Sequence, residues 1–446
     1  MKRHWALPAL LVALVGLASA VTAQAEPMFP YPYTQTVLDN GLTVVLVPME
    51  SPGMVAYYSI VRTGSRDEYE PGHSGFAHFF EHMMFRGTKK YPGDVYDKLM
   101  TEMGADANAF TSDDVTCYHI EFAAEDLELV MQLESDRFQN LAYTEPAFKT
   151  EAGAIYGEYR KSVASPGFVL FETLMNTAYD VHTYKHTTMG FEADIAAMPT
   201  MYDYSIAFFN RYYRPDNVVL VIVGDIETEP TLAMVRKYYG AWQKGYVPPQ
   251  VQPEPEQTAP RRADARFAGR TLPIVAIAYK APAYSATAIE PAACMLLGDL
   301  AFGETSAIYK KLVLDEQRVQ YLRGGAGLNR DPGLFTVTTM IKDPADRDAI
   351  EQEIYKTIAF FQANRVDEKR LADVKSNVKY GFLMGLETPG DVAGRLVDVL
   401  ALTGSMDSLN QFYETLNKVT PEDIMNAAKT YLTDARRTVV VVEGQS

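Results

Sequence analysis

The sequence contains very little cysteine: its 446 residues include only Cys117 and Cys294, one in each half of the chain. A small scaffold held together by disulfide bonds is therefore excluded, because such scaffolds concentrate several cysteines in a short chain. Both residues lie in apolar stretches, so we expect two buried thiols rather than a disulfide. They carry little information about the cellular compartment.

Positive charge is also scarce. Lysine and arginine number 41 against 57 aspartate and glutamate residues, the formal net charge is −16, and the only basic cluster is at the first three residues. Binding to nucleic-acid phosphates needs clustered Lys and Arg, so nucleic acid is excluded as a partner. The chain is 47% hydrophobic and 22% charged, a globular composition at a length that suggests roughly two to four domains.

Residues 1–25 have the features of a secretory signal peptide. They combine a positively charged start, an apolar run from about Trp5 to Ala20, and a small-residue cleavage site ending at Ala25. The run is nearly long enough to span a bilayer, so a retained anchor is the alternative, although the proline within it and the cleavage site favour removal. We expect an exported, periplasmic protein with no stable membrane insertion after cleavage.

The rest of the first half alternates between strand-like and helix-like patterns, which indicates an α+β unit. A DNG turn between the first two expected strands is typical of a hairpin. The expected strands are 34–38, 42–47, 55–62, 115–122 and 218–223, and the expected helices are 73–85, 93–103, 125–138, 145–163 and 202–213.

The second half repeats the spacing of strand-like segments seen in the first. Val55 and Val218 begin similar strands in the first half, and Val275 and Val439 begin their counterparts at nearly the same separation. Equal spacing indicates a duplicated domain. Between the halves lies a stretch rich in Pro, Gln and Glu that reads as a linker. The predicted units are residues 26–245, a linker at 246–265, and residues 266–446.

Histidine is the third scarce residue, with seven in the chain and none after His186. Histidine-dependent chemistry must therefore lie in the first half. There, His78, Glu81 and His82 form an H-x-x-E-H pattern in a helix-like segment. Residues i and i+4 share a helix face, so both imidazoles can reach one metal ion while Glu81 stands beside the site. The order is the inverse of the commoner zinc-peptidase motif.

A catalytic zinc ion takes three protein ligands and keeps a fourth position open, so two histidines are not sufficient. The expected helix at 145–163 offers Glu151 and Glu158, two turns apart on one face. We predict that Glu158 is the third ligand. Glu151 would lie one layer behind, where it orients a ligand or holds Arg160 or a histidine. The alternative is that both glutamates belong to a solvated helix face.

Several segments spread over nearly the whole mature chain resemble the pitrilysin (insulinase-like) family of zinc metallopeptidases. These segments are DNGLTVVLVP, GSRDE, HFFEHMMFRGT, NAFT at 108–111, the glutamate pair 151 and 158, HTYKHTTMG, and YYRPDNVVLVIVGDI. The resemblance implies two duplicated α/β domains, each an antiparallel-rich sheet flanked by helices, which together form half of a clamshell. The first domain, 26–245, would bind zinc, and the second, 266–446, would not.

The resemblance also implies roles for the residues of the motif. One Zn²⁺ per chain would be held by His78, His82 and Glu158. Glu81 would be the general base that takes a proton from water and delivers it to the leaving amine. Glu151 matches a carboxylate that, in the family, lies behind the metal ligands and contacts one of them.

Substrate contacts follow from the same resemblance. Asn108, Ala109 and Thr111 would lie on a sheet edge to which the peptide adds as a strand, a mode of binding that reads backbone more than side chains. For Asn108, the alternative is a residue in a turn. From the second half, Tyr321 would contact the substrate and help to stabilise the oxyanion.

One departure from the family pattern concerns the arginine that accompanies this tyrosine. Its position is taken by Leu314, and Arg318 and Arg323 lie nearby without the right spacing. Oxyanion donors contribute orders of magnitude in rate. We therefore predict a dimer in which a second, zinc-free family subunit supplies Arg and Tyr, with a homodimer that uses Tyr321 alone as the alternative.

The sequence thus predicts an exported zinc metalloendopeptidase that acts on short or unfolded peptides inside a closed chamber. The alternative is a non-catalytic or partner-dependent subunit that binds peptides within a larger assembly. The two differ in whether the chain, once loaded with zinc, hydrolyses peptides. Neither cleavage preference nor the physiological substrate follows from the sequence.

Overall fold

The computed structural model describes residues 27–445, so the predicted signal peptide, residues 1–25, lies outside the described part of the chain. Within the described part, no helix combines the length and the apolar character needed to cross a bilayer.

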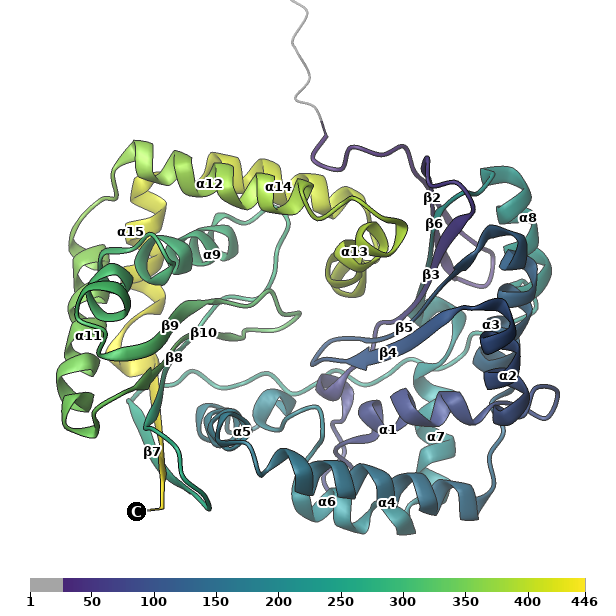
Figure 1. Cartoon of the computed structure of the whole chain (residues 1–446), viewed down its shortest axis with the longest axis horizontal. Coiled ribbons are helices and arrows are strands. Elements are labelled where there is room, and N and C mark those ends of the chain that lie inside the picture. Colours follow the sequence, from purple (N-terminus) through teal and green to yellow (C-terminus); the bar gives the residue numbers. More distant parts are fainter. Residues whose placement is uncertain (1–26, 446) are drawn as a thin grey trace, which may run out of the picture.

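The first half is built on a six-stranded sheet in the order β1-β2-β6-β3-β5-β4 (Figure 1). Strands β2 and β6 pair in parallel and the other neighbours are antiparallel. The strands are β1 (Thr34–Val37), β2 (Thr43–Pro48), β3 (Met54–Val61), β4 (Asp106–Thr111), β5 (Thr116–Ala123) and β6 (Val218–Gly224). β6 is buried at every residue, as expected for a strand covered on both faces.

The second half repeats this topology in a five-stranded sheet of order β7-β11-β8-β10-β9, again with one parallel pair, β7 and β11. The strands are β7 (Arg261–Phe267), β8 (Ile274–Lys280), β9 (Val319–Ala326), β10 (Leu334–Ile341) and β11 (Arg437–Gly444). If the strands are numbered along the chain from β2 in the first sheet and from β7 in the second, they lie side by side in the same order in both sheets: first, fifth, second, fourth, third. The predicted duplication is therefore present, and β9 occupies the place of β4.

Helices connect the strands in both halves (Figure 1). Those of the first half are α1 (Phe76–Met83), α2 (Gly93–Met103), α3 (Leu127–Asn140), α4 (Glu145–Ser162), α5 (Pro166–Ala178), α6 (Glu192–Ala197), α7 (Tyr202–Tyr212) and α8 (Thr228–Tyr239). Those of the second half are α9 (Ile289–Phe302), α10 (Ala307–Tyr309), α11 (Arg347–Ala363), α12 (Glu368–Leu383), α13 (Pro389–Thr403), α14 (Asp407–Lys418) and α15 (Pro421–Tyr431).

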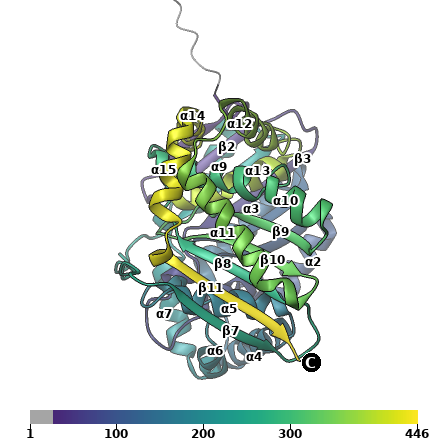
Figure 2. The ribbon, with the colours of Figure 1, turned by 90° about the vertical axis from the view of Figure 1, so that its left-hand side faces the viewer.

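Each half contributes one helix to the other. Leu170 and Leu174 of α5 pack on β8 and β11 of the second sheet, and Leu396 and Leu400 of α13 pack on β3 and β6 of the first sheet. The opposite face of each sheet is covered by its own helices. Figure 2 shows α11 and α15 in front of the second sheet. The two sequence halves therefore share their cores and depend on each other for stability.

The expected linker at 246–265 ends earlier than predicted, because β7 begins at Arg261. The strand was not predicted because the sequence of β7 is highly charged. It pairs with β11 at the edge of the sheet, and its residues alternate between half-buried and exposed. The segment before it is held by Glu254, whose carboxylate accepts the backbone N–H groups of Asp180, Val181 and His182. The segment is therefore fixed to the first half.

The structure confirms the prediction for the cysteines, since Cys117 and Cys294 are both buried free thiols. Burial raises the pKa of the Cys294 thiol to about 12. This thiol therefore remains protonated and unreactive at neutral pH.

Candidate metal centre

Helix α1 carries the H-x-x-E-H pattern and begins at Phe76, three residues later than predicted. The preceding Gly75 has φ +94°, and a Cβ at this position would lie 2.6 Å from the carbonyl oxygen of Met189, so only glycine fits. The buried carboxylate of Glu68 accepts the N–H groups of Gly75 and Ala77, each at 2.7 Å. Glu68 therefore fixes the start of the helix that presents the histidines, a role that the sequence did not reveal.

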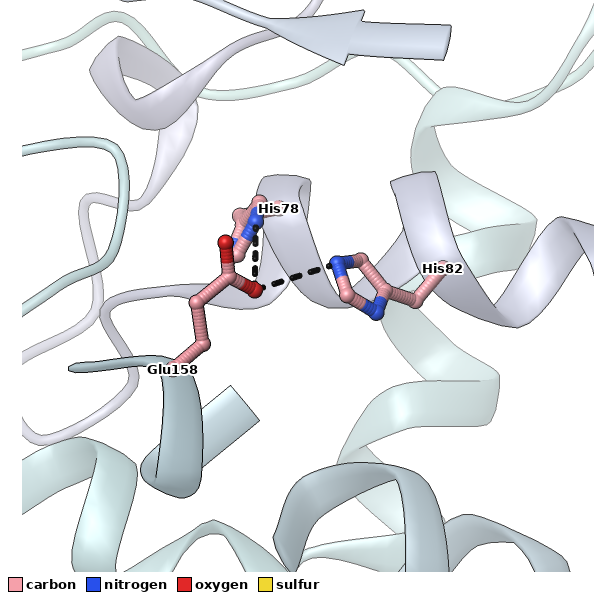
Figure 3. A group of neighbouring side chains, drawn as sticks. All are labelled: His78, His82 and Glu158. Carbon is pink, nitrogen blue, oxygen red and sulfur yellow. Dashed lines mark ion pairs between the residues drawn. The ribbon is translucent and has the colours of Figure 1, made fainter. Parts of the chain in front are cut away.

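The structure brings His78, His82 and Glu158 together from two helices, α1 and α4 (Figure 3). Their ligand atoms all lie within 4.8 Å of one another. The Oε2 atom of Glu158 is 3.8 Å from Nε2 of His78 and 3.5 Å from Nε2 of His82. Two ligands of one tetrahedral zinc ion stand about 3.3 Å apart. The donor set and its spacing therefore fit a zinc ion after small shifts.

Glu151 lies behind His82. Its Oε1 atom is 3.1 Å from Nδ1 of His82, and its Oε2 atom accepts Nε of Arg86 at 2.6 Å. Nδ1–H of His82 can donate to this carboxylate, which leaves Nε2 free to face the cluster. Burial raises the pKa of Glu151, but the bonds from His82 and Arg86 outweigh it and the pKa is lowered. Glu151 therefore contacts a histidine, as predicted, but its arginine partner is Arg86 rather than Arg160, which lies over the ring of Tyr156.

The two histidines differ in how they are held. Burial and the neighbouring His82 lower the pKa of His78 to about 4, so its imidazole is neutral at pH 7, the form that binds metals. Its Nδ1 atom is buried and finds no hydrogen-bond partner among residues 27–445, so packing holds this ring. For His82, the hydrogen bond to Glu151 raises the pKa.

Glu81 stands beside the cluster and contacts Thr111 of strand β4. The Thr111 hydroxyl donates to Oε2 of Glu81 at 2.7 Å. Burial raises the pKa of Glu81, which the hydroxyl partly offsets. A carboxylate that is half-buried and has one oxygen free is suited to exchange a proton with a nearby molecule. The contact was absent from the sequence prediction, which assigned Thr111 to the substrate.

Strand β4 is one of the two edge strands of the first sheet within residues 27–445, and β1 is the other. Asn108 lies within this strand, so its alternative as a turn residue is wrong. Its Oδ1 atom accepts the N–H of Ala109 at 2.8 Å, and the side chain thereby occupies a backbone donor on the open edge. Asn108 and Phe110 are exposed, while Ala109 and Thr111 on the other face are half-buried.

In the second half, Tyr321 lies on the edge strand β9 and is half-buried. Burial raises its pKa, and Arg323 lies 5.8 Å from the centre of its ring. Leu314 lies on a π-helical turn and is 56% exposed. Arg318 is bound to Asp346 through two hydrogen bonds, at 3.0 and 2.8 Å. Arg318 is thus engaged elsewhere and does not replace the arginine expected at position 314.

The fold and the side-chain cluster together define a class of protein. Two sheets of identical topology and a His-His-Glu cluster beside a free sheet edge form the architecture of a two-domain metallopeptidase. Family models agree: that described as insulinase (peptidase family M16) matches residues 45–192, and that described as peptidase M16 inactive domain matches residues 202–378. The chain belongs to this family of pitrilysin-like peptidases as a short two-domain member.

The chain is similar over most of its length to one curated relative and to two solved structures. The zinc protease PqqE of Helicobacter pylori is 28% identical over 99% of this chain and 100% of its own length. The crystal structure of a protease from Helicobacter pylori has a TM-score of 0.86 at 26% identity, over 93% of this chain and all of that one. The periplasmic protease PqqL of Escherichia coli has a TM-score of 0.75 at 19% identity, and the match covers 93% of this chain but 48% of PqqL.

Proposed function

We propose that the protein is an exported zinc endopeptidase that hydrolyses short or unfolded peptides. One observation carries the proposal: donor atoms of His78, His82 and Glu158 converge within 4.8 Å of one another beside Glu81. The relative from Helicobacter pylori is named a zinc protease, which supports the metal. Export rests on residues 1–25 and on the description of the structural neighbour PqqL as periplasmic.

His78 and His82 would hold the zinc ion from one face of α1, and Glu158 would hold it from α4. The ion, when bound, polarises the carbonyl of the scissile bond and makes water more acidic. Oε2 of Glu81 is occupied by the Thr111 hydroxyl, so Oε1 is the atom that accepts the proton of the attacking water. Glu81 then returns this proton to the nitrogen of the leaving amine. Glu151 keeps Nε2 of His82 directed at the cluster.

The peptide would bind as an added strand on β4. Its carbonyl groups would replace the Oδ1 atom of Asn108 as acceptor of the Ala109 N–H, and the freed Asn108 amide could then contact the peptide. Only an extended chain can present its backbone in this way. The enzyme therefore acts on peptides or unfolded segments.

A second family subunit would complete the enzyme. This chain corresponds to 48% of PqqL, and position 314 holds leucine where the resemblance implies an arginine. We propose a heterodimer in which the partner supplies Arg and Tyr, and a homodimer that relies on Tyr321 is the alternative. The identity of the polypeptides in the dimer purified from its natural source, determined by mass spectrometry of the separated subunits, distinguishes the two.

The test is Glu81→Gln, measured by metal analysis and by cleavage of a quenched fluorescent peptide, with the partner present if one co-purifies. Glu102→Gln, an exposed glutamate on α2, is the matched control. We expect one zinc per chain in all three proteins and loss of cleavage in Glu81→Gln alone. Cleavage by Glu81→Gln at the wild-type rate would refute the mechanism. A zinc-loaded wild type that binds peptides without cleaving them would establish the non-catalytic alternative.

A further inference from the structure

A cavity of about 410 Å³ lies on the seam between the two halves. Helix α5 of the first half forms one wall with Leu170, Phe171 and Leu174. Strands β9 and β10 of the second half form the other wall, with Tyr321 from β9. The cavity falls within the size range of natural ligand pockets.

The α5 wall is apolar and reaches the surface. Leu170 and Leu174 are 6% and 4% exposed, but Phe171 is 43% exposed. Together, Leu170, Phe171 and Leu174 give this wall one apolar surface that extends from the interior to the solvent. On the opposite wall, strands β9 and β10 contribute hydroxyl groups from Tyr321, Thr336 and Thr338, and Asn329 and Asp113 also line the cavity. The cavity therefore suits an apolar side chain whose edge is in contact with hydroxyl groups.

The segment that follows β4 reaches the cavity. Asp113 lines it and follows Thr111 by two residues, which corresponds to at most about 7 Å of extended chain. Thr111 in turn contacts Glu81. The bend that carries Asp113 is fixed, because Ser65 donates to its carboxylate at 3.2 Å and the N–H of Arg66 donates to its carbonyl.

A peptide strand on β4 would advance about 3.3 Å per residue. Two or three residues therefore separate a bond held beside Glu81 from a side chain that reaches the cavity past Asp113. Tyr321, predicted from the sequence to contact the substrate, lies on the cavity wall. Asp113 is thus the residue at which the segment after β4 reaches the cavity.

We propose that this cavity is a specificity subsite that binds one large apolar side chain, of the leucine, methionine or phenylalanine type, two or three residues from the scissile bond. The inference rests on the proposed peptidase function. It adds a substrate class, since peptides with a bulky apolar residue at that position would be preferred over those with alanine or a charged residue.

The test changes the exposed wall of the cavity. Phe171→Glu places a carboxylate there at a residue that is exposed enough for the fold to tolerate the change. Phe360→Glu, on a phenylalanine of α11 that is also exposed, at 55%, is the matched control. The substrates are peptides in which each position within four residues of the cleaved bond is varied among Leu, Ala and Lys. Cleavage by the zinc-loaded enzyme gives kcat/KM for each peptide. Binding to Glu81→Gln versions of all the proteins gives Kd without turnover.

We expect the wild type and Phe360→Glu to favour Leu over Ala at one position, by roughly 10- to 200-fold in kcat/KM and in Kd. In Phe171→Glu this preference should fall toward unity, and Lys should become the preferred residue at that position. Cleavage with no apolar preference at any position, or a preference that Phe171→Glu leaves intact, would overturn the subsite while the peptidase function stood. A wild type that is loaded with zinc and assayed with its partner subunit, and that cleaves none of the peptides but binds them with the expected preference, would refute the peptidase function and leave the subsite in place.

Discussion

The hydrogen bond between Thr111 and Glu81 leads to a specific expectation for catalysis. Thr111→Val removes the hydroxyl and keeps the branched shape that suits a strand. Glu81 would retain its place on α1 but lose the only hydrogen bond that its side chain makes within the described residues. The carboxylate could then rotate, and Oε1 would no longer be directed at the attacking water.

The size of the effect follows from the bond. A hydrogen bond to a charged group contributes about 1.5–3 kcal/mol, and each 1.4 kcal/mol of lost transition-state stabilisation is about tenfold in rate. We therefore expect kcat to fall by roughly 10- to 100-fold in Thr111→Val. The KM should change little, because the bond involves the base rather than the peptide. Thr111→Ser, which keeps the hydroxyl, should recover most of the rate.

The assay is steady-state cleavage of one fluorescent peptide by wild type, Thr111→Val and Thr111→Ser at equal zinc content. Zinc content also serves as a check on folding, since Thr111 contacts none of the three proposed ligands. A raised KM with an unchanged kcat in Thr111→Val would refute this reasoning. Such a result would indicate that Thr111 binds the substrate, as the sequence predicted.

Three further changes test other parts of the structure. Burial raises the pKa of Asp113 to about 6, so the fold binds this proton more tightly than the unfolded chain does. The free energy of unfolding should therefore fall by up to about 3 kcal/mol as the pH rises from 4 to 6. Urea titrations of Asp113→Asn should lack this fall. Glu254→Ala removes the carboxylate 3.4 Å from buried Lys280, and urea unfolding should show a loss of about 3–5 kcal/mol. Gly298→Ala should lose about 1–3 kcal/mol because its Cβ would meet the backbone at 2.6 Å, whereas Gly153→Ala, with open space around it, should gain about 0.5–1 kcal/mol.

Much of the fold could be read from the sequence because its signals are local. The DNG turn, the strand at 218–223 and the helix beginning at Glu145 each depend on residues within a few positions of one another, and all are present. The exchange of α5 and α13 between the halves could not be read in this way. An amphipathic pattern shows that a helix buries one face, but it does not say which sheet receives that face.

The same distinction applies to the site. The spacing of His78 and His82 follows from helix geometry, which is local, and the structure places them on one face as expected. The partner of Glu151 depends on which distant side chain reaches it. Arg86 lies on the 3-10 turn that follows α1, and its sequence distance from Glu151 gave no hint of the contact. Thr111 and Glu81 meet for the same reason, through the packing of β4 against α1.

The duplication allows the place of the His-His-Glu cluster to be compared with the corresponding place in the second half. Helix α9 stands where α1 stands, and β9 stands where β4 stands. In the first half, the helix and strand meet through side chains, with the Thr111 hydroxyl on Glu81. In the second half they meet almost backbone to backbone, since a Cβ at Gly298 would lie 2.6 Å from Cα of Gly325. Imidazole and carboxylate groups need space between helix and strand, and close packing has removed that space. Within the described part of the second half, the lack of histidine is thus accompanied by closer packing of helix on strand at the corresponding place.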